Sequence, residues 1–481
     1  AAGLSRGQAK LFSISPHALA AEHTSARVKG FRLADSDSRR PVSMLRLARR
    51  RRPAQQRVSH APSTRLQLST LSDALHAEAA RGSLPPAQQH PSAFEQCVGN
   101  TRLIRLRGPS EATGCCIYGK AEYDNPGGSV KDRAALAMIK DAEERGILVR
   151  GEPGIVVEGT AGNTGIGLAL AARTFGYETV ICLADTQSQE KKDQLRWAGA
   201  TLVEVPAVPF RNPNNYVHVA ARLAEALADH QRSAHARARV FYANQWDNLA
   251  NRNAHYDGTG PEIRMQLAAV GVTLDAFSCA MGTGGTLSGC AEYFREVSFG
   301  NIRIGLTDPE GAAIVNYHRT GQLASQGSSI SEGIGQGRIT GERSALHSSR
   351  WQGRDRFDVR ALVLCGVTGN MEGFKPDDGL IFEIPDAEML HVLQKLQSED
   401  GLAVGGSAGI NVAGAMRVAQ ALGPGHTVAT VLCDRAERYA GKLYNTDFLR
   451  AKGLPPPPWL DTPAVSLPKG MLESCLVEAD E

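Results

Sequence analysis

A short apolar run, Gly-Ile-Val-Val-Glu at 154–158, leads directly into a glycine-rich turn, Gly-Thr-Ala-Gly-Asn-Thr-Gly at 159–165. The run predicts a buried strand, and the apolar face after the turn predicts a helix over 163–176. Small residues at such a turn let the backbone approach a ligand closely, and the free N–H groups at the helix start would suit a carboxylate. The turn is not a dinucleotide site, because Leu170 stands where the third glycine belongs.

The same alternation of strand and helix continues along the chain. Repeated βα units are typical of an α/β fold whose mainly parallel sheets are covered by helices on both faces. Ligands bind such folds at the carboxyl ends of the strands, so the loops there are candidate sites. The other predicted strands lie at 179–183, 201–205, 274–280, 302–306 and 427–433, and the other predicted helices at 188–198, 215–229, 286–297 and 408–421.

The composition of the 481 residues is that of a globular protein, with 42% hydrophobic and 21% charged residues. Positive and negative charges nearly cancel, leaving +3, so we expect no nucleic-acid partner. No apolar stretch approaches the roughly 18 residues of a transmembrane helix. The nine cysteines include no C-x-x-C pair, so we expect mostly small buried thiols and no metal site.

The first 60 residues carry 13 Lys and Arg against three acidic residues, with frequent Ser and Ala. An Arg-rich, Ser-rich and acid-poor segment is typical of an organelle transit peptide. We therefore predict a disordered basic leader over 1–90 that directs the protein to mitochondria. The alternative is a basic arm, or residues upstream of a true start at Met44, in which case the protein would be cytoplasmic.

A second glycine-rich turn, Asn-Pro-Gly-Gly-Ser-Val at 125–130, comes directly before Lys131 and an apolar helix. A lone lysine at such a junction is ordinarily a solvated surface residue. Lys131 becomes a candidate functional residue only in combination with the other glycine-rich turns.

A third turn, Met-Gly-Thr-Gly-Gly-Thr-Leu at 281–287, again joins a predicted strand to a predicted helix. Backbone N–H groups, two hydroxyls and the positive end of a helix dipole suit a phosphate. The turn lacks the Lys-Ser/Thr ending of a P-loop, and Leu287 breaks the dinucleotide spacing. The sequence therefore indicates the phosphate of a ligand smaller than a nucleotide, with a purely structural turn as the alternative.

A fourth turn, Gly-Gly-Ser-Ala-Gly at 405–409, formally matches the nucleophile elbow of serine hydrolases. That triad needs an acid and then a histidine downstream of the serine. His426 is the only histidine after Ser407, and no Asp or Glu lies between them. The sequence therefore does not support a hydrolase.

Together and in this order, the four turns resemble the pyridoxal-phosphate β-family of fold type II, the tryptophan synthase β-like fold. Within it the chain looks most like cysteine synthase (O-acetylserine sulfhydrylase) and the catalytic core of cystathionine β-synthase, over roughly residues 95–450. Four further stretches agree: Ala-Asn-Gln-Trp at 243–246, Thr-Gly-Pro-Glu-Ile at 259–263, Asp-Pro-Glu-Gly at 308–311 and Glu-Gly-Ile-Gly at 332–335.

The resemblance implies a role for each turn around the cofactor pyridoxal 5′-phosphate. Lys131 would carry the cofactor as a Schiff base and then act as the catalytic base, which requires a pKa below the usual value of about 10.4. Asn163 would hydrogen-bond the ring hydroxyl, and Ser407 would face the pyridine nitrogen. The resemblance assigns the phosphate to Gly282, Thr283, Gly284, Gly285 and Thr286, and the substrate's α-carboxylate to Thr160, Gly162, Thr164 and Gln245.

The activity implied by the resemblance is synthesis of L-cysteine from O-acetylserine, or another activated serine, and sulfide through an aminoacrylate intermediate. Cystathionine β-synthase activity on serine and homocysteine, cysteine desulfhydration, and a non-catalytic role as a partner protein remain alternatives. Two positions depart from the family. Ala161 replaces the usual serine of the carboxylate-binding turn, and Gln187 stands before Ser188 where methionine is usual.

The resemblance also implies a homodimer whose subunit has two domains. A large cofactor-binding domain would span 95–130 and 246–450, and a small mobile domain 131–245. Residues 341–368 do not match the family, and we interpret them as a surface insertion or an unspliced intron of the gene model. Residues 451–481 are predicted to form an extended C-terminal tail.

Overall fold

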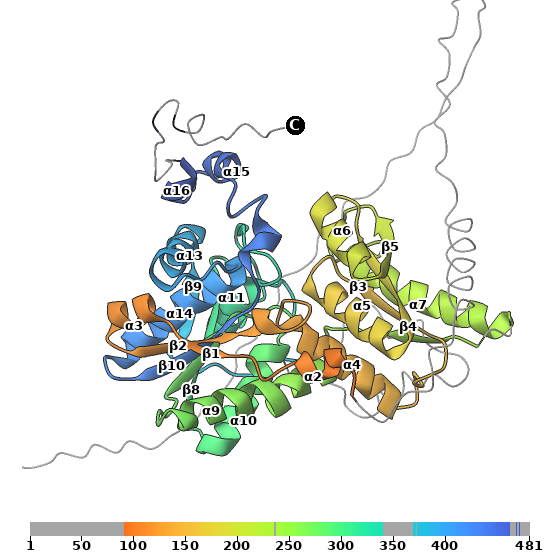
Figure 1. The fold of residues 1–481 in the computed structure, drawn as a ribbon, viewed down its shortest axis with the longest axis horizontal. Helices are drawn as coiled ribbons and strands as arrows, with labels where there is room; N and C mark the ends of the chain where they lie inside the picture. The colour runs from red at the N-terminus through yellow and green to blue at the C-terminus, as the bar shows by residue number, and fades with distance from the viewer. Residues whose placement is uncertain are drawn as a thin grey trace, which may run out of the picture. The chain divides into compact units, whose positions relative to one another are not determined.

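The computed structural model describes residues 91–234, 237–339, 369–371 and 373–461, together with Pro468 and Met471. The predicted leader and the whole of the 341–368 insertion lie outside the described residues, as does most of the predicted tail. The described part of the tail is not extended throughout as predicted, because Pro458–Asp461 form a short helix. The described residues build two β-sheets with flanking helices (Figure 1).

The larger sheet has six strands in the order β1-β2-β10-β7-β8-β9. β1 pairs antiparallel with β2, and all other neighbours are parallel. The carboxyl ends of β10, β7 and β8 therefore share one edge of the sheet. The bounds are β1 Leu103–Arg105, β2 Cys116–Ala121, β7 Ala276–Cys279, β8 Arg303–Pro309, β9 Ile381–Ile384 and β10 Thr427–Leu432.

Helices cover both faces of this sheet, because side chains alternate along its strands. On β10, Val428 and Leu432 join the apolar cluster of α13 and α14, whereas Ala429 and Val431 join that of α9, α10 and α11. The helices are α3 Arg107–Thr113, α9 Gly260–Ala269, α10 Gly285–Ser298, α11 Ala313–Thr320, α13 Asp386–Asp400 and α14 Gly406–Leu422.

The smaller sheet has four parallel strands in the order β5-β4-β3-β6. Val156 of β3 packs with α4 and α5 on one face, and Ile155 and Val157 pack with α7 on the other. The elements are β3 Gly154–Gly159, β4 Tyr177–Ala184, β5 Ala200–Val205, β6 Arg239–Tyr242, α4 Lys131–Glu144, α5 Asn163–Phe175, α6 Gln189–Trp197 and α7 Tyr216–Ser233.

The remaining elements are short. They precede the first strand, connect the two sheets or follow the last strand. They are α2 Ala93–Cys97, η1 Glu122–Asp124, α8 Ala250–Ala254, η2 His255–Thr259, η3 Ala436–Tyr439, α15 Thr446–Ala451 and α16 Pro458–Asp461. None of the helices in the described part is both long and apolar enough to cross a membrane.

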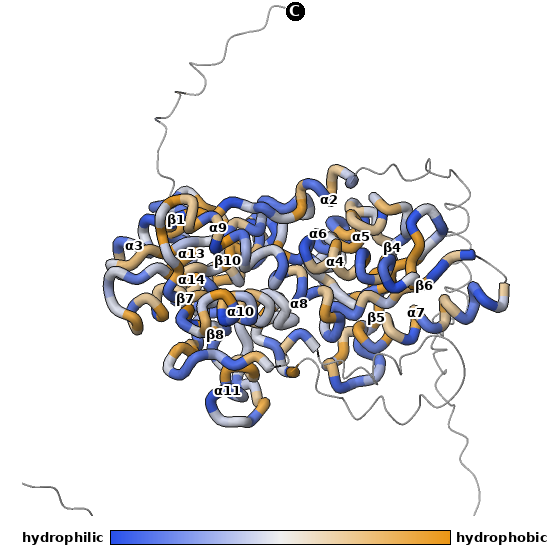
Figure 2. The backbone as a smooth tube through the Cα atoms, turned by 90° about the horizontal axis from the view of Figure 1, so that it is seen from below, coloured by the Kyte–Doolittle hydropathy of each residue, from blue (hydrophilic) through white to orange (hydrophobic). Residues whose placement is uncertain are grey.

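The α/β prediction is confirmed, including parallel sheets with helices on both faces. The helix predicted over 163–176 ends at Phe175, because Gly176 adopts the left-handed conformation at φ +84°. The helix predicted over 215–229 runs on to Ser233, since its buried face continues through Leu227 and Gln231. In Figure 2 the tube of α7 alternates between hydrophobic and hydrophilic residues, as expected for a helix covering a sheet.

The expectation for the cysteines holds in part. Cys115, Cys182, Cys279 and Cys290 are buried free thiols, whereas Cys97 is exposed. The exposed thiol lies at the end of the short helix α2, at the edge of the described chain. The structure therefore uses most of the described thiols as core side chains.

Candidate functional site

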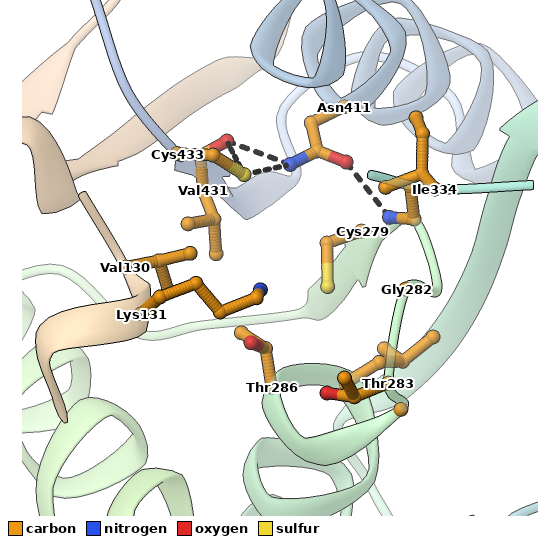
Figure 3. A pocket seen from close by; sticks show the side chains of 13 residues that line it. Val130, Lys131, Cys279, Gly282, Thr283, Thr286, Ile334, Asn411, Val431 and Cys433 are labelled. Carbon is orange, nitrogen blue, oxygen red and sulfur yellow. Dashed lines mark hydrogen bonds between the residues drawn. The ribbon is translucent and has the colours of Figure 1, made fainter. Parts of the chain in front are cut away.

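A pocket lies where β7 and β10 of the larger sheet end (Figure 3). Cys279 forms its wall at the end of β7, and Val431 and Cys433 form it at the end of β10. The pocket is thus at the strand edge where ligands bind parallel α/β sheets.

Lys131 is the first residue of α4, and its amine points into this pocket (Figure 3). The turn before it is joined to the end of β10. The Val130 N–H donates to the Cys433 carbonyl over 3.0 Å, and Ser129 pairs with Asp434 in an isolated bridge. These backbone contacts determine where the lysine side chain enters the pocket.

The third glycine-rich turn forms another wall of the pocket and the start of α10. Gly282, Thr283, Gly284 and Thr286 line the pocket. Gly285 belongs to the same turn and is buried behind it. The predicted phosphate turn and the predicted lysine therefore meet in one pocket.

Glycine is required at three positions of this turn. A Cβ on Gly282 would come within 2.4 Å of the Gly333 carbonyl oxygen, and a Cβ on Gly285 within 2.2 Å of the Asn251 side-chain oxygen. Gly284 has φ +88°, which side-chain-bearing residues rarely adopt. The turn is therefore a closed cradle that admits no side chain at these places.

The donor groups of this turn fit a phosphate. No described side chain caps the 14-residue helix α10, so its first N–H groups remain available to an anion. The Thr283 hydroxyl lines the pocket and is held there by a hydrogen bond from Asn251 Nδ2 over 2.8 Å. The residues present therefore fit the phosphate of pyridoxal phosphate.

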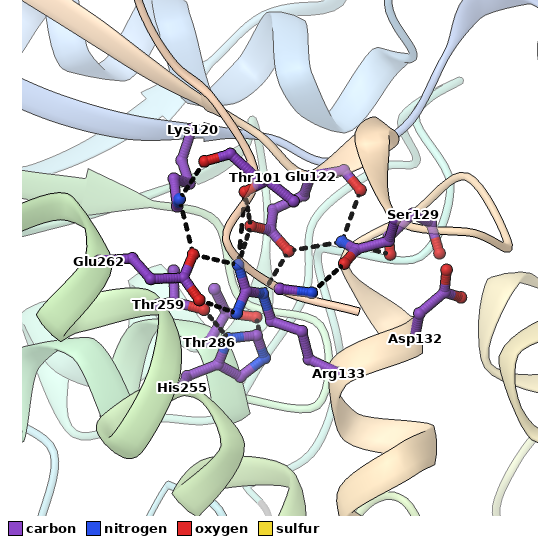
Figure 4. Close-up of polar contacts among 12 residues, drawn as sticks. Thr101, Lys120, Glu122, Ser129, Asp132, Arg133, His255, Thr259, Glu262 and Thr286 are labelled. Carbon is purple, nitrogen blue, oxygen red and sulfur yellow. Dashed lines mark hydrogen bonds and ion pairs between the residues drawn. The ribbon is translucent and has the colours of Figure 1, made fainter. Parts of the chain in front are cut away.

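A buried histidine stands behind Thr286. His255 Nε2 lies 3.2 Å from the Thr286 hydroxyl, and its Nδ1 lies 2.9 Å from the hydroxyl of Thr259 (Figure 4). Burial, together with the charges of Arg133 and Lys131, lowers the pKa of His255 well below its usual value. The imidazole is therefore neutral, and each ring nitrogen faces one hydroxyl.

Four charged side chains form a buried network next to this wall (Figure 4). Arg133 bonds Glu122 and Glu262, each over 2.7 Å, and Lys120 reaches Glu262 over 2.7 Å. Burial raises the pKa of Glu262, but Arg133 and Lys120 outweigh it and lower that pKa to about 2. The network joins β2, α4 and α9. Because Arg133 lies two residues after Lys131, the network anchors the start of α4.

The first-described turn, 159–165, belongs to the smaller sheet, between β3 and α5. The Thr164 hydroxyl donates to Gln245 Oε1 over 2.6 Å, and the Gly162 N–H donates to the Thr160 hydroxyl over 3.3 Å. Thr160, Thr164 and Gln245 are buried, whereas Gly162 is exposed. The four predicted carboxylate contacts therefore gather at one turn.

A buried carboxyl underlies this turn. Glu158 accepts hydrogen bonds from the backbone N–H of Gly159 over 3.0 Å and of Gln245 over 3.1 Å. Burial raises the pKa of Glu158 to about 7, although these hydrogen bonds act in the opposite direction. The carboxyl fixes Gln245 beside Thr164.

Ser407 begins the helix α14 and does not itself line the pocket. Its side chain interacts with the thiol of Cys433, which does line it, and acts to lower the pKa of that thiol. Burial and the nearby Asp434 raise the pKa of Cys433 to about 11, so the thiol is protonated. Ser407 is therefore one residue removed from the pocket wall.

The predicted site residues thus fall into two groups. Lys131 and the 282–286 turn share the pocket, and the 159–165 turn and Gln245 lie outside its wall. Asn251 connects the groups, because its Nδ2 donates to the Gln245 carbonyl and to the Thr283 hydroxyl, each over 2.8 Å.

Some residues of the site have no signal in the glycine-rich motifs. Asn411 lines the pocket and joins two strand ends, since it accepts the Ala280 N–H and donates to the Val431 carbonyl, each over 2.7 Å. An asparagine within an otherwise apolar stretch of α14 was the available signal. Cys433 is the last residue of the predicted strand 427–433, so the strand-end rule alone could have identified it.

Comparisons with known proteins give consistent matches. The model of the pyridoxal-phosphate dependent enzyme family matches residues 94–356. Cysteine synthase 1 of Neurospora crassa is 47% identical over 74% of this chain and 84% of its own length. A Saccharomyces cerevisiae relative, named "Putative mitochondrial cysteine synthase", is 35% identical over 73% of this chain and 83% of its own length. Among solved structures, the O-acetylserine dependent cystathionine beta-synthase from Helicobacter pylori matches with a TM-score of 0.57 and 28% identity, covering 74% of this chain and 99% of that one.

Proposed function

This chain belongs to the family of pyridoxal-phosphate-dependent enzymes, and we propose that it synthesises L-cysteine from an activated serine, such as O-acetylserine, and sulfide. The observation that carries the proposal is a single pocket that joins a lysine amine to a glycine-rich helix start. The 47% identity to a cysteine synthase over most of both chains supports the choice of reaction.

The bound cofactor supplies an electron sink that stabilises negative charge at the substrate's α-carbon and lets the β-substituent leave. Lys131 holds the cofactor aldehyde through Nζ and, once released, takes the proton from the α-carbon. The turn 282–286 binds the phosphate with its N–H groups and with the hydroxyls of Thr283 and Thr286.

The second turn binds the substrate in this proposal. Thr160, Gly162, Thr164 and Gln245 contact the α-carboxylate, and Asn163 donates to the oxygen of the cofactor ring. The Ser407 hydroxyl, which lies behind the pocket-lining Cys433, would face the pyridine nitrogen once the cofactor is bound. A hydroxyl cannot hold a proton on that nitrogen as a carboxylate can, which favours loss of the β-substituent over wider delocalisation of charge.

We also propose that the two sheets belong to two domains, with the large one over 95–130 and 246–450 and the small mobile one over 131–245. The order of strands along the chain supports this division, since β3 to β6 alone make the smaller sheet. Closure of the small domain over the substrate would exclude water from the reacting carbon.

Replacing Lys131 by alanine tests the proposal directly. The purified wild-type protein should be yellow, and Lys131→Ala should lose the visible absorbance band and at least about 10²–10⁴-fold of the activity. Lys140→Ala is the matched control, because Lys140 lies on the same helix and pairs with Glu95 at the surface. A colourless wild-type protein would instead support a non-catalytic partner protein.

Cystathionine β-synthase activity is the second candidate, because the Helicobacter pylori match carries that activity in its name. Four assays separate the two: O-acetylserine or serine, each with sulfide or homocysteine. We expect the largest kcat/KM for O-acetylserine with sulfide. A larger kcat/KM with homocysteine than with sulfide would show that the protein synthesises cystathionine and not cysteine.

We propose further that the protein is a mitochondrial homodimer. The basic composition of residues 1–60 and the mitochondrial name of the yeast relative support the location. Cell fractionation of the tagged full chain, and light scattering of the purified protein, test the two statements separately.

A further inference from the structure

The residues directly after β10 are absent from the glycine-rich motifs, yet they contact the candidate site from two sides. Besides the Val130–Cys433 hydrogen bond next to the predicted lysine, the Gly405 N–H donates to the Asp434 carbonyl over 3.1 Å, near the predicted serine. The side chain of Asp434 extends to a third predicted residue, Asn163. One short segment therefore reaches all three parts of the predicted cofactor site.

The Asn163 side-chain amide is bonded at both of its polar atoms. Its Nδ2 donates to Asp434 Oδ2 over 2.7 Å, and its Oδ1 accepts a hydrogen bond from Arg438 Nη1. A flipped amide would put an oxygen against a carboxylate and an NH₂ group against a guanidinium. Because neither arrangement can form a hydrogen bond, Asp434 and Arg438 allow only one orientation of the amide.

The carboxylate of Asp434 is itself held in place. It is 1% exposed, and its Oδ2 also accepts the Tyr439 hydroxyl over 2.6 Å. A Cβ on Gly405 would come within 2.2 Å of Asp434 Oδ1, so the segment packs closely there. The orientation of Asn163 is therefore fixed by a rigid neighbour.

This orientation has a chemical consequence for a ring oxygen next to Asn163. The second N–H of Nδ2 has no acceptor within the described part of the chain, and Asn163 is partly exposed. An N–H donor stabilises a deprotonated, negatively charged ring oxygen, whereas an amide oxygen would require a protonated hydroxyl. The direction of the amide thus selects the protonation state of the oxygen that it meets.

We propose that Asp434 and Arg438 are positioning residues of the cofactor site. They hold the Asn163 amide so that an N–H, and not the carbonyl oxygen, faces the ring oxygen of bound pyridoxal phosphate. The inference rests on the proposed function, since it needs the cofactor in this site. It adds two residues that act through Asn163 without touching the substrate.

The absorbance spectrum of the resting holoenzyme, without substrate, tests this inference. The ratio of the visible to the near-ultraviolet cofactor band reports whether the ring oxygen is deprotonated. Asp434→Ala and Arg438→Met should each lower this ratio, and the double variant should lower it further. Titration of the cofactor back into the resolved proteins should show about ten-fold weaker binding for Asp434→Ala, the loss expected for a hydrogen bond to a charged group.

Two control variants separate positioning from stability. Tyr439→Phe removes a donor to the same carboxylate oxygen but leaves the Asn163 contact, so it should lower the melting temperature without moving the band ratio. Glu437→Ala changes an exposed acid of the same segment and should alter neither quantity. Asp434→Asn keeps an accepting oxygen and should give an intermediate ratio, which also serves if Asp434→Ala does not fold.

A band ratio in Asp434→Ala and Asp434→Asn equal to that of Tyr439→Phe would overturn the inference, because the segment would then be only structural. That outcome leaves the proposed function intact, since the wild-type protein would still carry the cofactor. A wild-type protein without any cofactor band would instead overturn the proposed function itself.

Discussion

The turns at 282–285 and 159–165 both lead from a parallel strand into a helix, but their surroundings differ. In the 282–285 turn, the positions that a side chain would take are occupied by Gly333, Asn251 and Met371. In the 159–165 turn, Gly159 and Gly165 at the two ends are packed against Val217 and Leu195, but no described atom lies within 4 Å of the corresponding position at the central Gly162, which is exposed. The 159–165 turn is therefore open only at its centre. A closed turn suits a group that stays bound, and an open turn suits one that enters and leaves.

The largest effect is expected from Gly282→Ala in the closed turn. The methyl group would meet a backbone oxygen 2.4 Å away, and overpacking of this kind costs about 1–3 kcal/mol. Cofactor affinity should therefore fall by up to about a hundred-fold, measured by titration of the resolved protein. An unchanged affinity would show that the turn is not the phosphate site.

The second effect concerns the buried acid beneath the closed turn. Asp308 accepts the Met281 N–H over 3.1 Å, and burial raises its pKa from 3.8 to about 8. The folded protein therefore keeps a proton that the unfolded chain loses, and stability falls as the pH rises from about 4 to about 8. The side chain of Asp308→Asn cannot ionise. The melting temperature of this variant, relative to that of the wild type, should therefore rise by a few degrees as the pH increases from about 4 to about 8. Parallel melting curves would contradict the assigned protonation.

In the open turn, Thr164→Val should affect the substrate and not the cofactor. The change removes the donor to Gln245 Oε1 and leaves a buried acceptor without a partner, at about 1–3 kcal/mol. We expect KM for the amino-acid substrate to rise about ten-fold, with the visible cofactor band unchanged. Loss of the band in this variant would show that the 159–165 turn also binds the cofactor, and not only the substrate.

A smaller effect is expected when the missing hydroxyl of the open turn is restored. Ala161→Ser adds a hydroxyl donor to the turn that we propose binds the substrate's α-carboxylate. One neutral hydrogen bond is worth about 0.5–1.5 kcal/mol, so KM should fall by about two- to ten-fold in steady-state assays. A rise in KM would indicate that the active site is adapted to alanine.

The smallest effect is expected from Gly162→Ala, the counterpart of the first substitution. The added methyl group meets no described atom within 4 Å, and φ is −128°, which alanine adopts without strain. Cofactor affinity and melting temperature should remain close to those of the wild type. A loss as large as that of Gly282→Ala would show that both turns are closed in solution.

Much of the fold was predictable because its signals are local. The apolar run at 154–158 and the glycines after it specify a strand, a turn and a helix within a dozen residues, and α5 begins at Asn163 as predicted. The antiparallel strand β1 was not among the predicted strands, since three partly exposed residues carry no periodic pattern. The end of α7 was misjudged because the surface of the smaller sheet, and not helix propensity, determines how far the buried face extends.

The candidate site divides in the same way. Lys131 and the 282–286 turn could be identified from sequence, because neighbouring residues must supply the turn, the free N–H groups and the helix start. Asn251, Asn411 and Asp434 could not, since each acts by joining segments that lie far apart along the chain. A hydrogen bond between distant segments depends on how strands are ordered in a sheet, and only the packed structure specifies that order.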